Sequence, residues 1–256
     1  MNEAPLKEWL ERDGSLLRLR LARPKANLID AAMIRALFNV FSSYRSNAKL
    51  LAVLIDHEGP HFSFGASVEE HLPGQCEEML KGLHALLGTM LEWPRPILVA
   101  ARGQCLGGGL ELALAGNLLY LAPDAKLGQP EMRLGVFAPA ASVLLPLRIG
   151  QARAEDLLYS GRSVDAQSAL DWGLVNQIAD DPSAAALAYF ESHLMGKSAA
   201  ALAHAVRAAR EPFALLARAR LDDVEALYLD ELMATRDANE GLQAFIEKRQ
   251  PRWEHR

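Results

Sequence analysis

The sequence has little of what marks several large classes of protein. Only two cysteines occur, Cys76 and Cys105, too few for a disulfide framework or a cysteine-based metal site. No apolar run approaches the roughly 20 residues that a bilayer-spanning helix needs. The formal net charge is −5 and no basic stripe offsets it, which argues against a nucleic-acid-binding surface. The charged N-terminal segment lacks the apolar core of a signal peptide, so we expect a cytoplasmic protein.

Several catalytic and nucleotide-binding motifs are also missing. There is no Gly-x-Gly-x-x-Gly or Walker pattern, so the sequence gives little support for NAD or a nucleoside triphosphate. There is no Gly-x-Ser-x-Gly elbow, although spacing alone does not exclude a Ser-His-Asp triad. His57, His61 and His71 are spaced too irregularly for a metal-binding motif. We therefore expect no metal and no cofactor.

What is present indicates an α/β protein that ends in helices. Half of the 256 residues are apolar and 23% are charged, which is typical of a globular chain with a sizeable core. Alternating and continuous apolar runs predict strands that are separated by helices, the order expected of an α/β fold. From Ala140 onward nearly all of the pattern is helical. We expect a core over residues 1–195 and, in the same fold unit, a helical oligomerisation region over 196–256.

The expected elements follow from these patterns. In the first part we expect strands at 15–21, 50–55, 97–101 and 117–122 and helices at 29–43 and 77–91. In the second part we expect a strand at 173–178 and helices at 141–149, 152–159, 165–172, 183–194, 199–210, 212–236 and 241–249.

The segment Gly103–Glu111 is the most informative in the chain. Three consecutive glycines follow an apolar run and precede a helical pattern. Each glycine costs about 0.5–1 kcal/mol against alanine inside an ordered element, so the run suggests a backbone that something must approach closely. Free N–H groups at the start of a helix suit an oxyanion. The alternative is a tight turn with close packing of helix on strand.

Two glutamates and a second glycine loop are candidates for a site. Glu111 lies just inside the helix that the glycines open, and Glu131 follows a turn after the fourth expected strand. Two carboxyls that lie close together raise one pKa, which gives an acid and a base near neutral pH. Taken alone, each glutamate is more often a surface charge or a helix cap. The loop His61–Ser67 suggests a turn whose backbone is exposed in an apolar cleft, or simply a loop packed on the core.

Taken in order, these motifs resemble the crotonase (enoyl-CoA hydratase/isomerase) superfamily over nearly the whole chain. Gly103–Leu112 matches the glycine signature of that family, and Lys126–Glu131 matches the segment that bears its second glutamate. Phe62–Ser67 is similar to its Phe-Ala/Ser-Ala-Gly-Ala-Asp loop. Arg23–Asn27 lies where the family has its first CoA-contacting turn, and Asn239–Arg249 resembles its C-terminal helix. The resemblance implies a crotonase-like spiral of ββα units with a helical C-terminal trimerisation region.

The resemblance also implies a substrate and a set of site residues. The substrate is an acyl-CoA thioester, so that CoA is part of the substrate and not a cofactor. The backbone N–H groups of Phe64 and Gly108 would form the oxyanion hole for the thioester oxygen as it becomes an enolate. Glu111 and Glu131 fall on the two positions that activate water and deliver a proton. A homotrimer or a dimer of trimers is expected. The other implied contacts with the acyl group or with CoA are Lys25, Ala26, Ser63, Gly65, Ala66, Gly107, Phe137, Phe245 and Lys248.

Three departures from the family pattern imply a differently shaped acyl pocket. Phe64 replaces the usual alanine before the glycine, and Ser67 replaces the usual aspartate. Residues 135–146 carry bulkier apolar side chains in place of the family's Gly-Gly-Thr-Gln helix start.

The acyl group implied by these segments is a flat ring. Residues 61–71 and 136–142 most resemble the family members that hydrate a cyclic conjugated dienoyl-CoA in anaerobic degradation of benzoyl-CoA. An apolar pocket with Phe64 and Phe137 suits such a ring. The implied activity is that of a lyase, which adds hydroxide at the β carbon of the diene and a proton at its γ carbon.

Two other functions stay open at this point. One is an ordinary enoyl-CoA hydratase or isomerase, which a panel of acyl-CoA substrates separates from the cyclic case. The other is a non-catalytic CoA-binding or RNA-binding relative. Glu111 and Glu131 argue against that last alternative, because a binding protein needs neither.

Overall fold

The structure, a computed structural model, describes residues 4–72 and 74–256 and is built around a six-stranded sheet. The strand order is β1-β2-β3-β4-β6-β9, with β1 antiparallel to β2 and every other neighbouring pair parallel. Parallel neighbours need a crossover segment between them. Helices α1, α2 and α3 provide the first three crossovers, and residues 122–176 provide the fourth, from β6 to β9. The strands are β1 (Leu6–Glu11), β2 (Leu16–Leu21), β3 (Ala52–His57), β4 (Ile97–Ala101), β6 (Leu118–Leu121) and β9 (Gln177–Ile178).

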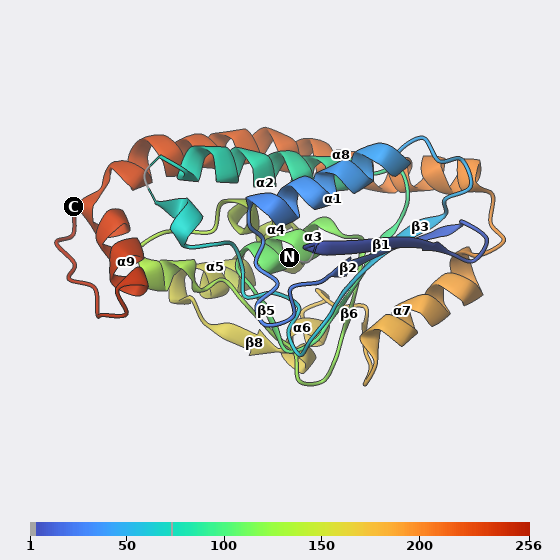
Figure 1. The fold of residues 1–256 in the computed structure, drawn as a ribbon, viewed down its shortest axis with the longest axis horizontal. Helices are drawn as coiled ribbons and strands as arrows, with labels where there is room; N and C mark the ends of the chain where they lie inside the picture. The colour runs from blue at the N-terminus through green and yellow to red at the C-terminus, as the bar shows by residue number, and fades with distance from the viewer. Residues whose placement is uncertain (1–3, 73) are drawn as a thin grey trace.

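Both faces of the sheet are covered, as its continuous apolar strands require. The larger core lies between the sheet and helices α1 (Ala31–Tyr44) and α2 (Cys76–Leu91), while the smaller one lies under α7 (Pro182–Tyr189). Adjacent residues of β2 separate the two, because Leu16 belongs to the smaller core and Leu17 to the larger. Figure 1 shows α1 and α2 on one side of the sheet and α7 on the other.

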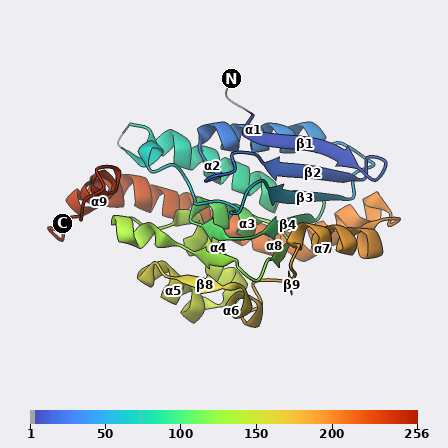
Figure 2. The same cartoon turned by 60° about the horizontal axis from the view of Figure 1, so that its bottom comes forward.

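A second sheet of three strands, β5-β7-β8, follows the carboxyl ends of β4 and β6 along the chain and leads into the glycine segment. Its strands are β5 (Gln104–Leu106), β7 (Lys126–Gly128) and β8 (Ser163–Asp165). Because β5 ends directly before the glycines and β7 directly before Glu131, the parallel pairing of these two strands brings the two predicted motifs together. Figure 2 shows β8 beside helices α5 and α6.

The remaining helical segments complete the described chain. The other α-helices are α3 (Gly108–Ala115), α4 (Pro139–Ile149), α5 (Gln151–Ser160), α6 (Ala166–Asp171), α8 (Ala199–Ala226) and α9 (Arg236–Ile246). Shorter turns are the 3₁₀ segments η1 (Glu69–His71), η2 (Pro130–Leu134) and η5 (Leu232–Ala234), and the π segments η3 (Phe190–Leu194) and η4 (Leu227–Glu231).

The long helix α8 corrects the prediction of two helices that divide at Pro212. It runs unbroken from Ala199 to Ala226, with Pro212 inside. An interior proline costs about 3 kcal/mol because it removes a hydrogen bond and crowds the preceding turn. Here α8 packs along α2 and α4, and its buried residues, among them Ala217 and Leu221, join the main core. The helical C-terminal part therefore shares the core of the α/β part, while the boundary predicted after residue 195 stays an interpretation.

Three further differences from the predicted elements have local causes. The edge strand β1 was not predicted because its outward residues are charged and its apolar residues few. Strands β5, β7 and β8 have three residues each, too short for a periodic signal. Helix α9 begins at Arg236 and not at 241, because the Thr235 hydroxyl accepts the Ala238 N–H and caps it. Helix α1 agrees with the helix predicted at 29–43, and the side chain of Asp30 caps its start. Among the described helices, none has the length and apolar character needed to cross a membrane.

Candidate active site

The predicted motifs meet around one cavity of about 70 Å³. Glycine is required at its centre, because Gly65 and Gly107 both have positive φ, +110° and +51°. Of the predicted residues, eight line the cavity: Phe64, Gly65, Ala66, Gly107, Gly108, Glu111, Glu131 and Phe137. Apolar side chains such as Met79, Leu83, Val136 and Leu242 make up much of the remaining wall.

One predicted donor of the oxyanion hole is wrong. The N–H of Phe64 donates to the Ala26 carbonyl at 3.0 Å, so it is not available to a ligand. Two residues later, the N–H of Ala66 has no acceptor among the described residues, and the same holds for the N–H of Gly108. A Cβ built on Gly108 would lie only 3.2 Å from the Ala66 nitrogen, so the two groups lie side by side. The pair able to hold an oxyanion is therefore Ala66 with Gly108. The Phe64 ring instead lines the mouth of the cavity, 43% exposed.

Ser63 does not contact a substrate as predicted, because it is fully buried. Its hydroxyl donates to the Asn27 carbonyl at 2.8 Å and accepts the Gly65 N–H at 3.1 Å. Its backbone N–H and carbonyl pair with Gln104 and Leu106, on strand β5. Ser63 thus holds the loop in the conformation that leaves the Ala66 N–H open.

Glu111 is buried, with its carboxyl at the start of helix α4. Its Oε1 accepts the Ala141 N–H at 2.8 Å. Burial raises the pKa of Glu111 to about 7, against the opposing effect of hydrogen bonds from the Ala141 and Ala140 N–H groups. A carboxyl with this pKa exchanges a proton near neutral pH, as a general acid or base must.

Glu131 lines the same cavity from the 3₁₀ segment η2, with its carboxyl against Gly107. Burial raises its pKa to about 8, the negative charge of Glu111 raises it further, and its own backbone N–H lowers it. Because the two carboxyls repel when both are charged, the pair favours a state that holds one proton. With its amide nitrogen turned toward Glu131, the buried Gln129 donates to both carboxyl oxygens, at 3.2 and 3.1 Å. Gln129 was not predicted as a site residue, although the sequence shows it two residues before Glu131.

Aromatic side chains close the far wall of the cavity. Phe137 and His71 line it directly, and Tyr228 packs edge-on against both rings, with centroids 5.3 and 6.5 Å away. The Nδ1 of His71 pairs with the Ser67 carbonyl at 2.7 Å, and burial lowers the pKa of the ring, which favours the neutral form. Tyr228 comes from the π segment η4, far away in the sequence, so no local pattern predicts it.

Four predicted contacts lie outside this cavity. Lys25 is exposed on the turn before the site, and the carbonyl of Ala26 accepts a hydrogen bond from the Phe64 N–H. Phe245 is 54% exposed, and Lys248 lies just beyond the end of α9 with a φ of +55°. Their predicted roles at CoA stay predictions.

At the glycine signature, two carboxyls with raised pKa values line one cavity together with two N–H groups that have no acceptor among the described residues. This arrangement is suited to acid–base chemistry. The chain belongs to the Enoyl-CoA hydratase/isomerase family, whose profile matches residues 11–256. The predicted crotonase fold is thereby confirmed. A crystal structure of an enoyl-CoA hydratase/isomerase from Pseudoalteromonas atlantica T6c superimposes with a TM-score of 0.84 at 27% sequence identity, covering 97% of this chain and 99% of that one.

Two relatives place the chain more narrowly. It is 63% identical to cyclohexa-1,5-dienecarbonyl-CoA hydratase of Thauera aromatica, over 100% of both chains. It is 32% identical to a probable enoyl-CoA hydratase of Bacillus subtilis (strain 168), over 92% of this chain and 93% of that protein.

Proposed function

We propose that the chain is a hydro-lyase that adds water to cyclohexa-1,5-diene-1-carbonyl-CoA to give 6-hydroxycyclohex-1-ene-1-carbonyl-CoA. The observation that carries this proposal is the 63% identity to the Thauera aromatica hydratase over the full length of both chains. The apolar cavity with Phe137 in its wall supports it, since a flat ring without polar substituents needs such surroundings.

The reaction divides between the N–H pair and the carboxyls. Water loses a proton to one carboxylate, and its oxygen forms a bond to the β carbon. The electron pair of the α,β double bond moves to the thioester oxygen, where Ala66 and Gly108 N–H groups hold the enolate. One such donor is worth roughly 3–4 kcal/mol in the transition state. The enolate then re-forms the carbonyl, the remaining double bond shifts to the α carbon, and the other carboxyl protonates the γ carbon.

The two carboxyls suit this division because the β and γ carbons lie across the ring from each other. A general base and a general acid are then needed at separate points. Glu111 from α3 and Glu131 from η2 approach the cavity from different elements. The pKa of Glu111 is raised to about 7 and that of Glu131 to about 8, so the pair holds a single proton near neutral pH.

The position of the new proton tests this function. In D₂O the product is expected to carry deuterium at the γ carbon, and mass spectrometry with NMR locates it. Deuterium at the carbon next to the thioester, as simple enoyl-CoA hydration gives, would favour an ordinary hydratase. No turnover of any acyl-CoA would favour a binding protein.

We also propose that the chain assembles as a homotrimer or a dimer of trimers in which CoA contacts Lys25, Ala26, Phe245 and Lys248. Exposed apolar side chains of the C-terminal helices support an interface there: Leu215, Leu216 and Leu227 are 66%, 51% and 45% exposed. Sedimentation at micromolar concentration tests it, and a fully active monomer would rule it out.

A further inference from the structure

Two arginines from other helices bind the C-terminal carbonyls of α3, the helix that carries Gly108 and Glu111. Arg148 Nη2 donates to the Leu114 carbonyl at 2.7 Å and also to the Gly116 carbonyl. Arg210 donates to the Ala115 and Gly116 carbonyls, the latter at 3.2 Å. These are the terminal carbonyls that α3 leaves without partners of its own.

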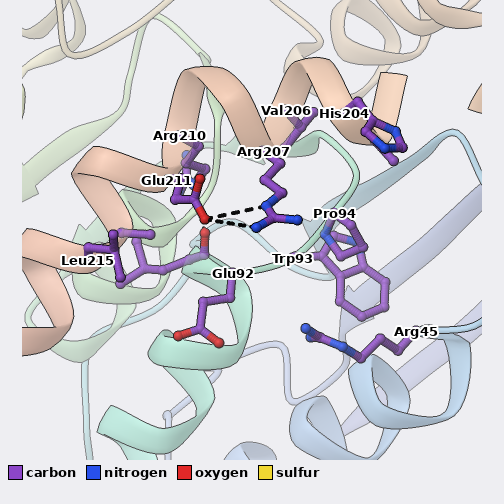
Figure 3. A pocket seen from close by; sticks show the side chains of 13 residues that line it. Arg45, Glu92, Trp93, Pro94, His204, Val206, Arg207, Arg210, Glu211 and Leu215 are labelled. Carbon is purple, nitrogen blue, oxygen red and sulfur yellow. Dashed lines mark hydrogen bonds and ion pairs between the residues drawn. The ribbon is translucent and has the colours of Figure 1, made fainter. Parts of the chain in front are cut away.

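Both guanidiniums are largely enclosed by protein, yet neither forms an ion pair within the described residues. Both stack over the Phe213 ring, each 5.3 Å from its centroid. Burial lowers the pKa of Arg148 to about 10 and that of Arg210 to about 9, with the charge of Arg148 adding to the second shift, so both stay charged at neutral pH. The one carboxylate next to Arg210 in sequence, Glu211, turns to Arg207 instead (Figure 3).

Two unpaired charges at a helix end need a reason, because desolvating a charge costs free energy. The C-terminus of a helix carries about half a negative charge, which attracts cations in the last turn. The two arginines therefore find their counter-charge in the backbone of α3. Arg210 also donates to Leu91, at the end of α2, at 3.2 Å, so it joins α2, α3 and α8.

Helix α4 contacts α3 at both ends. Near the start of α4, the Ala141 N–H binds the carboxyl of Glu111, and near its end, Arg148 binds the Leu114 carbonyl. Helix α3 has only eight residues, about 12 Å at 1.5 Å per residue. A rigid segment of that length transmits a shift at one end directly to the other, where Gly108 and Glu111 lie.

We propose that Arg148 and Arg210 are positioning residues for the reaction: by binding the C-terminal carbonyls of α3 they fix the oxyanion N–H of Gly108 and the carboxyl of Glu111. This inference rests on the proposed function. It assigns neither arginine a contact with substrate. Misplacement of reacting groups by about 1 Å lowers turnover by up to about 10²-fold, so a loosened α3 has a measurable consequence.

The test compares Arg148→Met and Arg210→Met with Arg95→Met. Arg95 is the matched control, because it is also partly buried and its hydrogen bonds go to backbone carbonyls outside α3, those of Leu50, Pro94 and Asn47. We expect kcat for the dienoyl-CoA to fall at least about 10-fold in the first two variants, with KM changed less than about 3-fold. The apparent pKa that Glu111 contributes to the pH dependence of kcat should also shift. Arg95→Met should lose thermal stability but keep both kcat and the pH profile.

Lysine variants and hydrogen exchange keep the test decisive. Arg148→Lys and Arg210→Lys retain the charge but lose the planar guanidinium and its stacking on Phe213, so an intermediate loss of kcat is expected even where a methionine variant does not fold. Exchange of the amides in residues 107–115, measured by mass spectrometry, should quicken in the Arg148 and Arg210 variants and not in Arg95→Met. Native kcat in both lysine variants, or equal kcat losses in all three methionine variants, would overturn the proposal. Exchange needs no turnover, so an inactive wild-type chain would refute the proposed function and leave this test intact.

Discussion

The carboxyl of Glu131 lies directly against the backbone of Gly107: a Cβ added at Gly107 would be 2.6 Å from Glu131 Oε1. The first two glycines of the run, Gly107 and Gly108, are thus explained by two neighbouring groups. Gly107 leaves room for the Glu131 carboxyl, and Gly108 leaves open the space beside the Ala66 nitrogen, where the proposed function places the thioester. Since φ at Gly107 is also +51°, a side chain there is strained as well as crowded.

Substitution of these glycines should therefore remove activity by two routes. Gly107→Ala is expected to displace Glu131 and lower kcat, while Gly108→Val is expected to abolish turnover because it fills the thioester's place. Gly82→Ala in α2 is the control, since its Cβ would meet only Ile34 Cγ2 at an ordinary 3.6 Å. Steady-state kinetics with circular dichroism separates these effects from misfolding. A Gly108→Val enzyme with native kcat would remove the oxyanion pair from the mechanism.

Glu111→Gln and Glu131→Gln should each preserve the fold and acyl-CoA binding but lower kcat by roughly 10²- to 10⁴-fold. Glutamine keeps the size and a hydrogen-bonding oxygen, yet it neither takes nor delivers a carboxyl proton. The double variant should lose much less than the product of the two single losses, because the residues act as a unit. Glu155→Gln is the control, because Glu155 is only partly buried, on α5, and does not line the cavity. Near-native kcat in either single variant would take that glutamate out of the reaction.

The dependence of kcat/KM on pH is expected to be bell-shaped, with its maximum between about 7 and 8. The reason is that one carboxyl must be charged and the other protonated, and the pKa values of the pair are raised to about 7 and about 8. A profile measured from pH 5 to pH 10 checks this. A kcat/KM that does not fall between pH 7 and pH 5 would contradict the raised pKa values of the two carboxyls.

Stability should change with pH in the direction set by Glu111. Burial raises its folded pKa from 4.5 to about 7, so between these values the folded chain binds more protons than the unfolded chain and stability falls as pH rises. Glu111→Gln removes this loss. The variant is expected to exceed the wild type in unfolding free energy above pH 7, by on the order of 3 kcal/mol, and to match it below about pH 4.5. Urea denaturation at pH 4.5 and pH 8 measures the difference, and a variant less stable at pH 8 would contradict it.

The sequence predicted those site residues that belong to a short local motif, and it missed those that depend on contacts between distant segments. Glu111 and Glu131 follow a glycine run and a turn, and the pairing of β5 with β7 joins those segments. The choice between Phe64 and Ala66 as donor depended instead on a long-range hydrogen bond to Ala26, which no local pattern reveals. Tyr228 was not predicted for the same reason, because it is distant in sequence from the rest of the site.

The fold shows the same division. The strands and helices of the α/β part have clear periodicity, whereas the three-residue strands β5, β7 and β8 have too few residues to show any. Pro212 predicted a helix boundary, but packing of α8 along α2 and α4 outweighs the local cost of the proline.

The most direct test of the whole account is a comparison of two substrates. The kcat/KM of the purified chain should be higher for cyclohexa-1,5-diene-1-carbonyl-CoA than for crotonyl-CoA by at least about 10²-fold, because an apolar wall shaped for a ring gives a short linear chain fewer contacts. Crotonyl-CoA turned over faster than the cyclic dienoyl-CoA would contradict it.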